Sequence, residues 1–218
     1  MHVEIATEYY PRLTKWHVRR ALKWINPVDL AGIEFIRLMD DDPTDPNARK
    51  QPAYLRNPFY SGQYVKKNNR SAAHINLFTR NLYLGIPLLF KLTPVATLIT
   101  AFILAHEVAH HLVTYRHYIY EPTEKYKAYG TYDEYEEGMA DNYAYDVMRK
   151  MSANLYYRLG FWLRRILFKY FFEYGAIVWE KHEYKKAAYY WFCAFRMERD
   201  NLDATYWYQR AVKMVNNR

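Results

Sequence analysis

The spacing of apolar and polar residues differs before and after about residue 80: both helical and strand periods occur before it, and the helical period prevails after it. Residues 13–25 repeat apolar side chains at helical spacing between lysines and arginines, which predicts an amphipathic helix that stops at Asn26-Pro27. Three later segments alternate apolar and polar residues, the period of a β-strand: residues 32–39, 61–67 and 73–79. The polar turn at residues 68–71 makes the last two a predicted hairpin.

From residue 80 onward the pattern is helical, and one apolar stretch approaches the length of a membrane span. Residues 86–105 are mostly apolar over 20 positions, but Pro87, Lys91 and Pro94 interrupt them. The 11 residues that remain, 95–105, are too few to cross a bilayer and enough for a buried helix. We therefore expect no membrane span.

The composition favours an ordered, mostly helical α+β protein. Of 218 residues 51% are hydrophobic and only 7 are glycine. We expect a first unit at residues 1–150 with a small three-stranded sheet, and a helical unit at residues 151–218. The only cysteine, Cys193, excludes an internal disulfide framework and is expected in the core. The chain starts without the basic-then-apolar order of a secretion signal, so we expect a cytoplasmic protein.

The candidate chemistry lies in His106-Glu107-Val108-Ala109-His110, inside an apolar helical segment. Histidines at i and i+4 project from one face of a helix, so both imidazoles can bind one metal ion. Glu107 then lies near a metal-bound water, where a zinc hydrolase has its general base. The alternative is a helix with buried, hydrogen-bonded histidines that bind no metal.

A catalytic zinc ion needs a third protein ligand. In the metzincin pattern the third histidine follows ten residues after His106, where this chain has Arg116, so His117 is out of register. The side chain of His111 leaves the helix about 100° away from that of His110. Neither histidine therefore fits the site.

Acidic residues on the next predicted helix fit better. Glu137 and Asp141 are again spaced i and i+4, behind a capping-box pattern formed by Thr131 and Glu134. Glu137 would complete a site of two histidines and one glutamate, with Glu136 as the alternative ligand. Asp141 would accept the second ring N–H of a zinc-bound histidine and thereby fix its tautomer.

The pair of motifs, HExxH followed by ExxAD, resembles the gluzincin-like zinc metallopeptidases, and among them the ImmA/IrrE-type family, over about residues 10–150. The resemblance implies a zincin-like fold, one Zn²⁺ ion and hydrolysis of peptide bonds, in that family often in a regulatory DNA-binding protein. It implies zinc-ligand roles for His106, His110 and Glu137 and a catalytic role for Glu107. The chain departs from the family in its tyrosine-rich segment before Glu137 and in the sequence at residues 142–145.

Residues 151–218 predict a set of helices whose role is either to bind a partner or only to pack on the first unit. Large and small residues follow the spacing of one tetratricopeptide helix pair: Phe171, Gly175, Val178, Ala187, Trp191 and Ala194. This segment has 12 Lys and Arg against 6 Asp and Glu, which is most of the formal net charge of +8, so an acidic partner would dock here first. Nucleic acid is a conceivable partner, but no motif supports it.

Three functions are open at this point. They are a zinc-dependent endopeptidase that acts on a protein or peptide, a non-catalytic metal-binding regulator, and a helical adaptor. Glu107 favours the enzyme, because a site that only binds zinc does not need that carboxylate. Tyr143, Tyr145 and His117 are candidates for stabilising an oxyanion, and the sequence does not choose among them. It also leaves the oligomeric state open.

Overall fold

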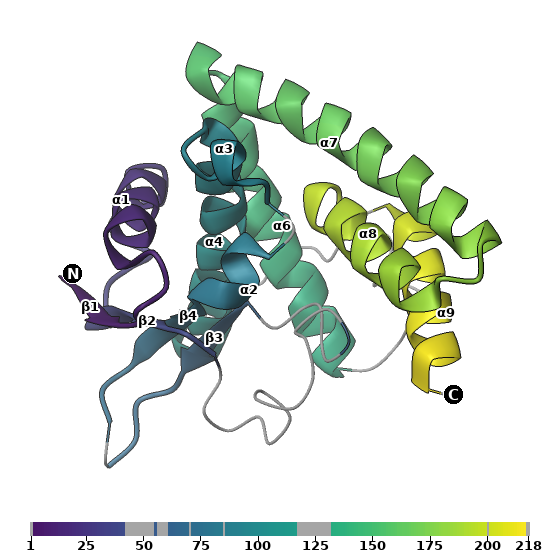
Figure 1. Ribbon diagram of the computed structural model, residues 1–218. Helices are drawn as coiled ribbons and strands as arrows, with labels where there is room; N and C mark the ends of the chain where they lie inside the picture. The colour runs from purple at the N-terminus through teal and green to yellow at the C-terminus, as the bar shows by residue number, and fades with distance from the viewer. Residues whose placement is uncertain are drawn as a thin grey trace.

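A computed structural model describes residues 2–41, 55, 61–69, 71–84, 86–116, 132–199 and 201–216 (Figure 1). In these residues the protein has an α+β fold that is mostly helical and contains one small mixed sheet. The expected fold class is therefore confirmed at this level. Thr131, His117 and most of the loop after residue 41 lie outside the part that is described, as does the side chain of Glu134, so the predicted capping box stays a prediction.

The sheet has four strands in the order β1-β2-β4-β3. Strands β1 (His2–Ala6), β2 (Phe35–Met39) and β4 (His74–Phe78) are parallel, and β3 (Gly62–Val65) pairs antiparallel with β4 at one edge. The β3–β4 hairpin was predicted and is confirmed. The sheet has one strand more than the three expected, because the sequence analysis did not identify β1, a five-residue edge strand whose side chains are mostly exposed.

Helices α1 (Pro11–Leu22) and α4 (Pro94–Arg116) pack against this sheet (Figure 1). The short helices α2 (Thr79–Tyr83) and α3 (Leu88–Lys91) lead from β4 into α4. By length and composition Pro94–Tyr115 is apolar enough to cross a membrane, but 94% of its most apolar window is buried inside the protein. In this structure α4 is the central helix of the core.

Helix α6 (Tyr132–Ser152) lies along α4 (Figure 1). Two alanines on each helix are at most 3% exposed: Ala105 and Ala109 on α4, and Ala140 and Ala144 on α6. Small side chains allow two helix backbones to come close. This packing brings the two predicted motifs to the same interface.

Three C-terminal helices complete the fold: α7 (Leu155–Glu180), α8 (Tyr184–Met197) and α9 (Leu202–Asn216). Helix α7 crosses α4 and α6, and α8 and α9 lie beneath its far half (Figure 1). All six positions of the predicted helix-pair pattern are buried, and a Cβ on Gly175 would lie 2.6 Å from Trp191 Nε1. Cys193 is fully buried, which raises its thiol pKa to about 12 and confirms it as a core residue.

Candidate metal centre

Facing side chains of α4 and α6 form a polar group within the helix interface. His106 and His110 project from α4, and Glu137 projects between them from α6. One ligand atom from each of these three residues lies within 4.8 Å of the others, so together they could hold a metal ion. The structure thus brings together the three side chains that the sequence singled out as ligands.

The distances within this group resemble those around a tetrahedral ion. The two Nε2 atoms are 3.1 Å apart, Glu137 Oε2 is 3.2 Å from His106 Nε2, and Glu137 Oε1 is 3.4 Å from His110 Nε2. In a tetrahedral site with bonds of about 2.0–2.1 Å, neighbouring ligand atoms are about 3.3–3.4 Å apart. The three side chains therefore need little rearrangement to surround one ion.

Each imidazole is oriented by a carboxylate on its other nitrogen. His106 Nδ1 donates to Asp141 Oδ1 at 2.9 Å, and His110 Nδ1 donates to Glu136 Oε1 at 2.9 Å. These contacts fix the tautomer that leaves the Nε2 lone pairs for a metal. Asp141 has the position expected from the sequence, whereas Glu136, the alternative ligand, orients His110 instead.

The charges in this interface favour a cation. Burial lowers the pKa values of His106 and His110, but the neighbouring carboxylates outweigh it, so the pKa of His106 is raised and that of His110 rises to about 10. The hydrogen bonds to the imidazoles lower the carboxyl pKa values of Glu136 and Glu137, and the charge of Arg199 together with the His106 hydrogen bond lowers that of Asp141. Two protonated Nε2 atoms 3.1 Å apart would repel each other, and one shared metal ion removes that repulsion.

Glu107 lies on the side of α4 that faces the edge strand β3. The backbone N–H of Tyr64 donates to Glu107 Oε2 at 2.7 Å, and the charge of Glu107 raises the pKa of His110. A Cβ on Gly62 would lie 2.9 Å from Glu107 Cγ and from its Oε1. Gly62 and Tyr64 therefore position this carboxylate, and the sequence pattern contained no signal for either role.

The remaining histidine and tyrosine candidates have other contacts. His111 is buried and bonds Ala31 O through Nε2 at 2.9 Å and the Tyr64 hydroxyl through Nδ1 at 3.1 Å, so it ties α4 to the sheet. The Tyr143 hydroxyl donates to Asp29 Oδ2 at 2.7 Å. The ring of Tyr145 packs on that of Phe102 with centroids 5.1 Å apart.

Comparisons with known proteins add no family to this geometry. No family model, curated protein or solved structure matches the chain. The chemistry of the site therefore follows from its own residues.

Proposed function

We propose that the protein is a zinc-dependent metallopeptidase with a zincin-like first unit. The observation that carries the proposal is the convergence of two imidazole Nε2 atoms and the Glu137 carboxylate, with Glu107 beside them. Two histidines and one carboxylate leave a fourth position open, which is typical of catalytic zinc sites and not of structural ones. The Glu137 side chain is 45% exposed, so water and substrate can reach the group from its side.

Zinc suits this donor set better than the common alternatives do. Magnesium and calcium prefer six or more oxygen ligands, whereas paired imidazoles with one carboxylate are ligands of zinc and similar ions. His106, His110 and Glu137 would hold the ion, with Asp141 and Glu136 orienting the imidazoles. When bound, zinc polarises a carbonyl group and makes a coordinated water acidic.

Residues of the chain would carry out the proton transfer, position the catalytic carboxylate and bind the substrate. Glu107 accepts a proton from the attacking water and returns it to the leaving amine, as a general base and then a general acid. The Tyr64 N–H holds Glu107 Oε2, which limits the positions of this carboxylate before the substrate arrives. The strand β3 runs beside Glu107 at the edge of the sheet, and the edge strand of a sheet is where an extended peptide can pair.

The C-terminal helices have a proposed role of their own. Their α7–α8 pair has the large and small spacing of a tetratricopeptide pair, and α9 packs on it through Trp207, whose ring lies 5.2 Å from that of Trp191. We expect these helices to bind the protein substrate. A regulatory protein is the substrate type that the resemblance suggests.

The test combines metal analysis with cleavage assays. The zinc-replete protein should contain about one zinc per chain by elemental mass spectrometry. It should also cleave peptides in a library made by digesting a cell proteome with trypsin. Glu107→Gln should keep the zinc and lose cleavage by roughly 10²- to 10⁴-fold, while Glu173→Gln, an exposed carboxylate on α7, should change neither.

The two other functions predict different results in the same experiment. If the protein binds zinc but shows no cleavage that is lost in Glu107→Gln, the metal-binding regulator is the function that remains. If the protein neither binds zinc nor cleaves peptides, the helical adaptor remains. Loss of zinc from Glu107→Gln would contradict the role given to that residue.

A further inference from the structure

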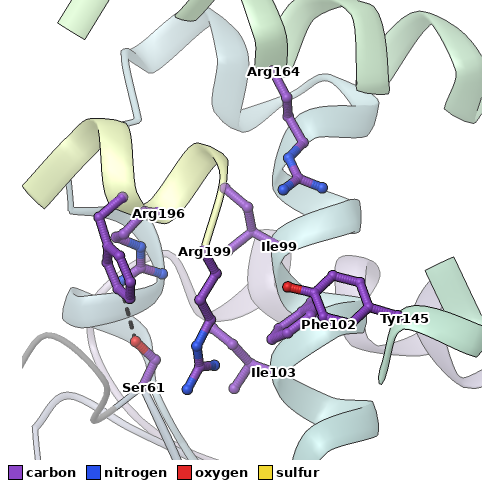
Figure 2. A pocket seen from close by; sticks show the side chains of 9 residues that line it. Ser61, Ile99, Phe102, Ile103, Tyr145, Arg164, Arg196 and Arg199 are labelled. Carbon is purple, nitrogen blue, oxygen red and sulfur yellow. Dashed lines mark hydrogen bonds between the residues drawn. The ribbon is translucent and has the colours of Figure 1, made fainter. Parts of the chain in front are cut away.

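A pocket lined by three arginines lies between the metal helix and the C-terminal helices. Its cavity is about 40 Å³, room for a few waters or one side-chain carboxylate. Figure 2 shows Arg164 reaching down from α7, and Arg196 and Arg199 coming from the end of α8 and the turn after it. The other lining residues are Ser61, Ile99, Phe102, Ile103, Tyr145 and Phe195. We call these nine residues the arginine pocket.

Arg196 contributes a buried positive charge whose hydrogen-bond partners are neutral. It is 8% exposed, and its guanidinium donates to Ser61 Oγ at 3.1 Å, to Leu82 O at 3.2 Å and to Asn81 O. Burial lowers its pKa to about 10, so it stays charged at neutral pH. A buried cation of this kind attracts an anion into the cavity beside it.

The other two arginines are held by the same helices. Arg164 Nε donates to Met197 O at 2.9 Å, which fixes the side chain between α7 and the end of α8. The Arg199 guanidinium lies 5.3 Å from the centre of the Phe102 ring. The C-terminal unit therefore supplies every positive charge of the pocket, and α4 supplies most of its apolar wall.

The arginine pocket lies one helical turn away from the candidate metal centre along both α4 and α6. Phe102 comes four residues before His106 on α4, and Tyr145 comes four residues after Asp141 on α6; the Phe102 and Tyr145 rings are 5.1 Å apart. Ile103 also approaches Gly62, the residue that contacts Glu107. The pocket is thus the next layer of side chains above the two imidazoles.

A second cavity of about 430 Å³ shares Tyr145, Arg164 and Arg199 with the arginine pocket. It adds the exposed Arg165, together with Glu198 and Asn201, among its lining residues. Because Arg165 is at the surface, this cavity is a route from the solvent to Arg164 and Arg199. The space is large enough for part of a peptide to enter.

We propose that the arginine pocket binds the carboxylate side chain of an aspartate or glutamate in a peptide substrate, within about two residues of the cleaved bond. The inference rests on the proposed peptidase function and adds the class of side chain that the site selects. Guanidinium groups pair with carboxylates in strong charge-assisted hydrogen bonds, and the walls formed by Ile99 and Ile103 suit the methylene groups. An extended peptide advances about 3.3 Å per residue, so this pocket is within reach of a peptide bound at the metal.

The test maps cleavage sites in the proteome-derived tryptic library for the zinc-loaded full-length protein. At one position within two residues of the cleaved bond, Asp and Glu should be preferred over Asn and Gln by about tenfold or more, the usual worth of a charged hydrogen bond. Arg199→Gln and Arg164→Gln should each reduce this ratio to below about twofold, and Arg199→Lys should retain part of it. Arg158→Gln removes an exposed arginine from α7 and should leave the ratio unchanged.

Other outcomes overturn the inference in distinguishable ways. A wild-type enzyme that holds zinc and cleaves peptides without an acidic preference overturns the pocket assignment alone. So do variants that slow the cleavage of all peptides equally, because that result shows a structural role for the arginines. If Arg164→Gln fails to fold, Arg199→Gln decides the matter. A zinc-replete protein that cleaves no peptide overturns the proposed function, and the pocket assignment with it.

Discussion

Two clusters of charged side chains meet α4 one helical turn apart, and they have opposite charge. The metal centre places three carboxylates around two imidazoles, with His106 and Asp141 both almost completely buried. The arginine pocket places three guanidinium groups among backbone carbonyls, a hydroxyl group and aromatic rings. The proposals place a cation at the first cluster and a substrate carboxylate at the second.

Under the two proposals, reactivity and selectivity would come from different parts of the chain. Among the described residues, the candidate metal ligands and the carboxylates that orient the imidazoles come from α4 and α6, whereas the arginines come from α7, α8 and the turn after α8. The two clusters still influence each other: the charge of Arg199 contributes to the lowered pKa of Asp141 and opposes the carboxylates that raise the pKa of His106. We expect changes in the first cluster to affect chiefly the cleavage rate, and changes in the second to affect chiefly the preference for an acidic side chain. The following predictions test that separation.

The largest effect is expected from removing a metal ligand. His110→Ala should reduce bound zinc to well below one per chain and lower peptide cleavage by at least about 10³-fold, because zinc supplies several kcal/mol of transition-state stabilisation. Zinc content and cleavage rate measure the two effects. The control is His182→Asn in the exposed α7–α8 turn, where φ is 58° and asparagine is tolerated. Full zinc occupancy in His110→Ala would remove His110 from the ligand set.

The next largest effects are expected from Asp141 and Glu136, the carboxylates that orient the imidazoles, and the two effects on zinc affinity should differ in size. Asp141→Asn should weaken zinc affinity by about 10- to 100-fold, because the amide can accept the Nδ1–H hydrogen bond of His106 but lacks the negative charge that strengthens it. Glu136→Gln should have a smaller effect, since the Glu136 side chain is 21% exposed and that of Asp141 is 2% exposed. Competition with a coloured zinc chelator measures both affinities. Equal effects would show that burial does not set the strength of these contacts.

A third histidine shows what burial does without carboxylates. His17 on α1 is fully buried, and its hydrogen-bond partners are neutral: Thr97 Oγ1 and Lys91 O, each at 2.7 Å. Burial lowers its pKa from 6.5 to about 4. Between these values the unfolded chain binds a proton that the folded chain does not, so the His17 contribution to stability is present above pH 6.5 and lost as the pH falls toward 4.

Denaturant unfolding at pH 7 and pH 5 tests this contrast. The wild-type free energy of unfolding should fall by about 2 kcal/mol more than that of His17→Gln, whose side chain can still donate to Lys91 O. An equal fall in both proteins would show that His17 is protonated in the folded state. His106 and His110 are the same in both proteins, so their titration cancels in the difference.

The sequence was sufficient for residues whose geometry is set within one helix. The i and i+4 spacing places His106 with His110, and Glu137 with Asp141, before any packing is known. It could not assign Glu136, because adjacent helical residues point about 100° apart and the rotation of α6 against α4 decides which one meets His110. The zinc itself remains a prediction.

The arginine pocket could not be predicted, because its residues lie between positions 61 and 199 and meet only in the folded protein. The excess positive charge of the C-terminal segment was visible, but the pattern did not show that it faces the metal helix. Strand β1 was missed for a related reason, since its five residues are a short signal and it pairs with β2, more than 30 residues further along the chain. The role of Gly62 could not be predicted either, because it depends on the close approach of Gly62 to Glu107 and Ile103 on α4.

The smallest of these effects is expected at Gly62. A Cβ there would lie 2.9 Å from Glu107 Cγ and Oε1 and equally close to Ile103 Cγ2, so Gly62→Ala must displace the Glu107 carboxylate from its place beside β3. The ligands of the metal are not touched. We expect normal zinc content and a cleavage rate lowered by about tenfold, because a misplaced general base still acts but with poorer geometry.

Gly160→Ala provides the matched control for this last change. It creates similar crowding, 2.8 Å from Leu98 Cδ1 and 2.9 Å from Pro94 Cβ, but on α7 and away from Glu107. It should lower the thermal midpoint and leave the cleavage rate per zinc-loaded molecule unchanged. If Gly62→Ala cleaves as fast as the wild type, β3 does not position Glu107. If both variants lose cleavage equally, the loss comes from general destabilisation, and the division between a catalytic first unit and its supporting helices fails.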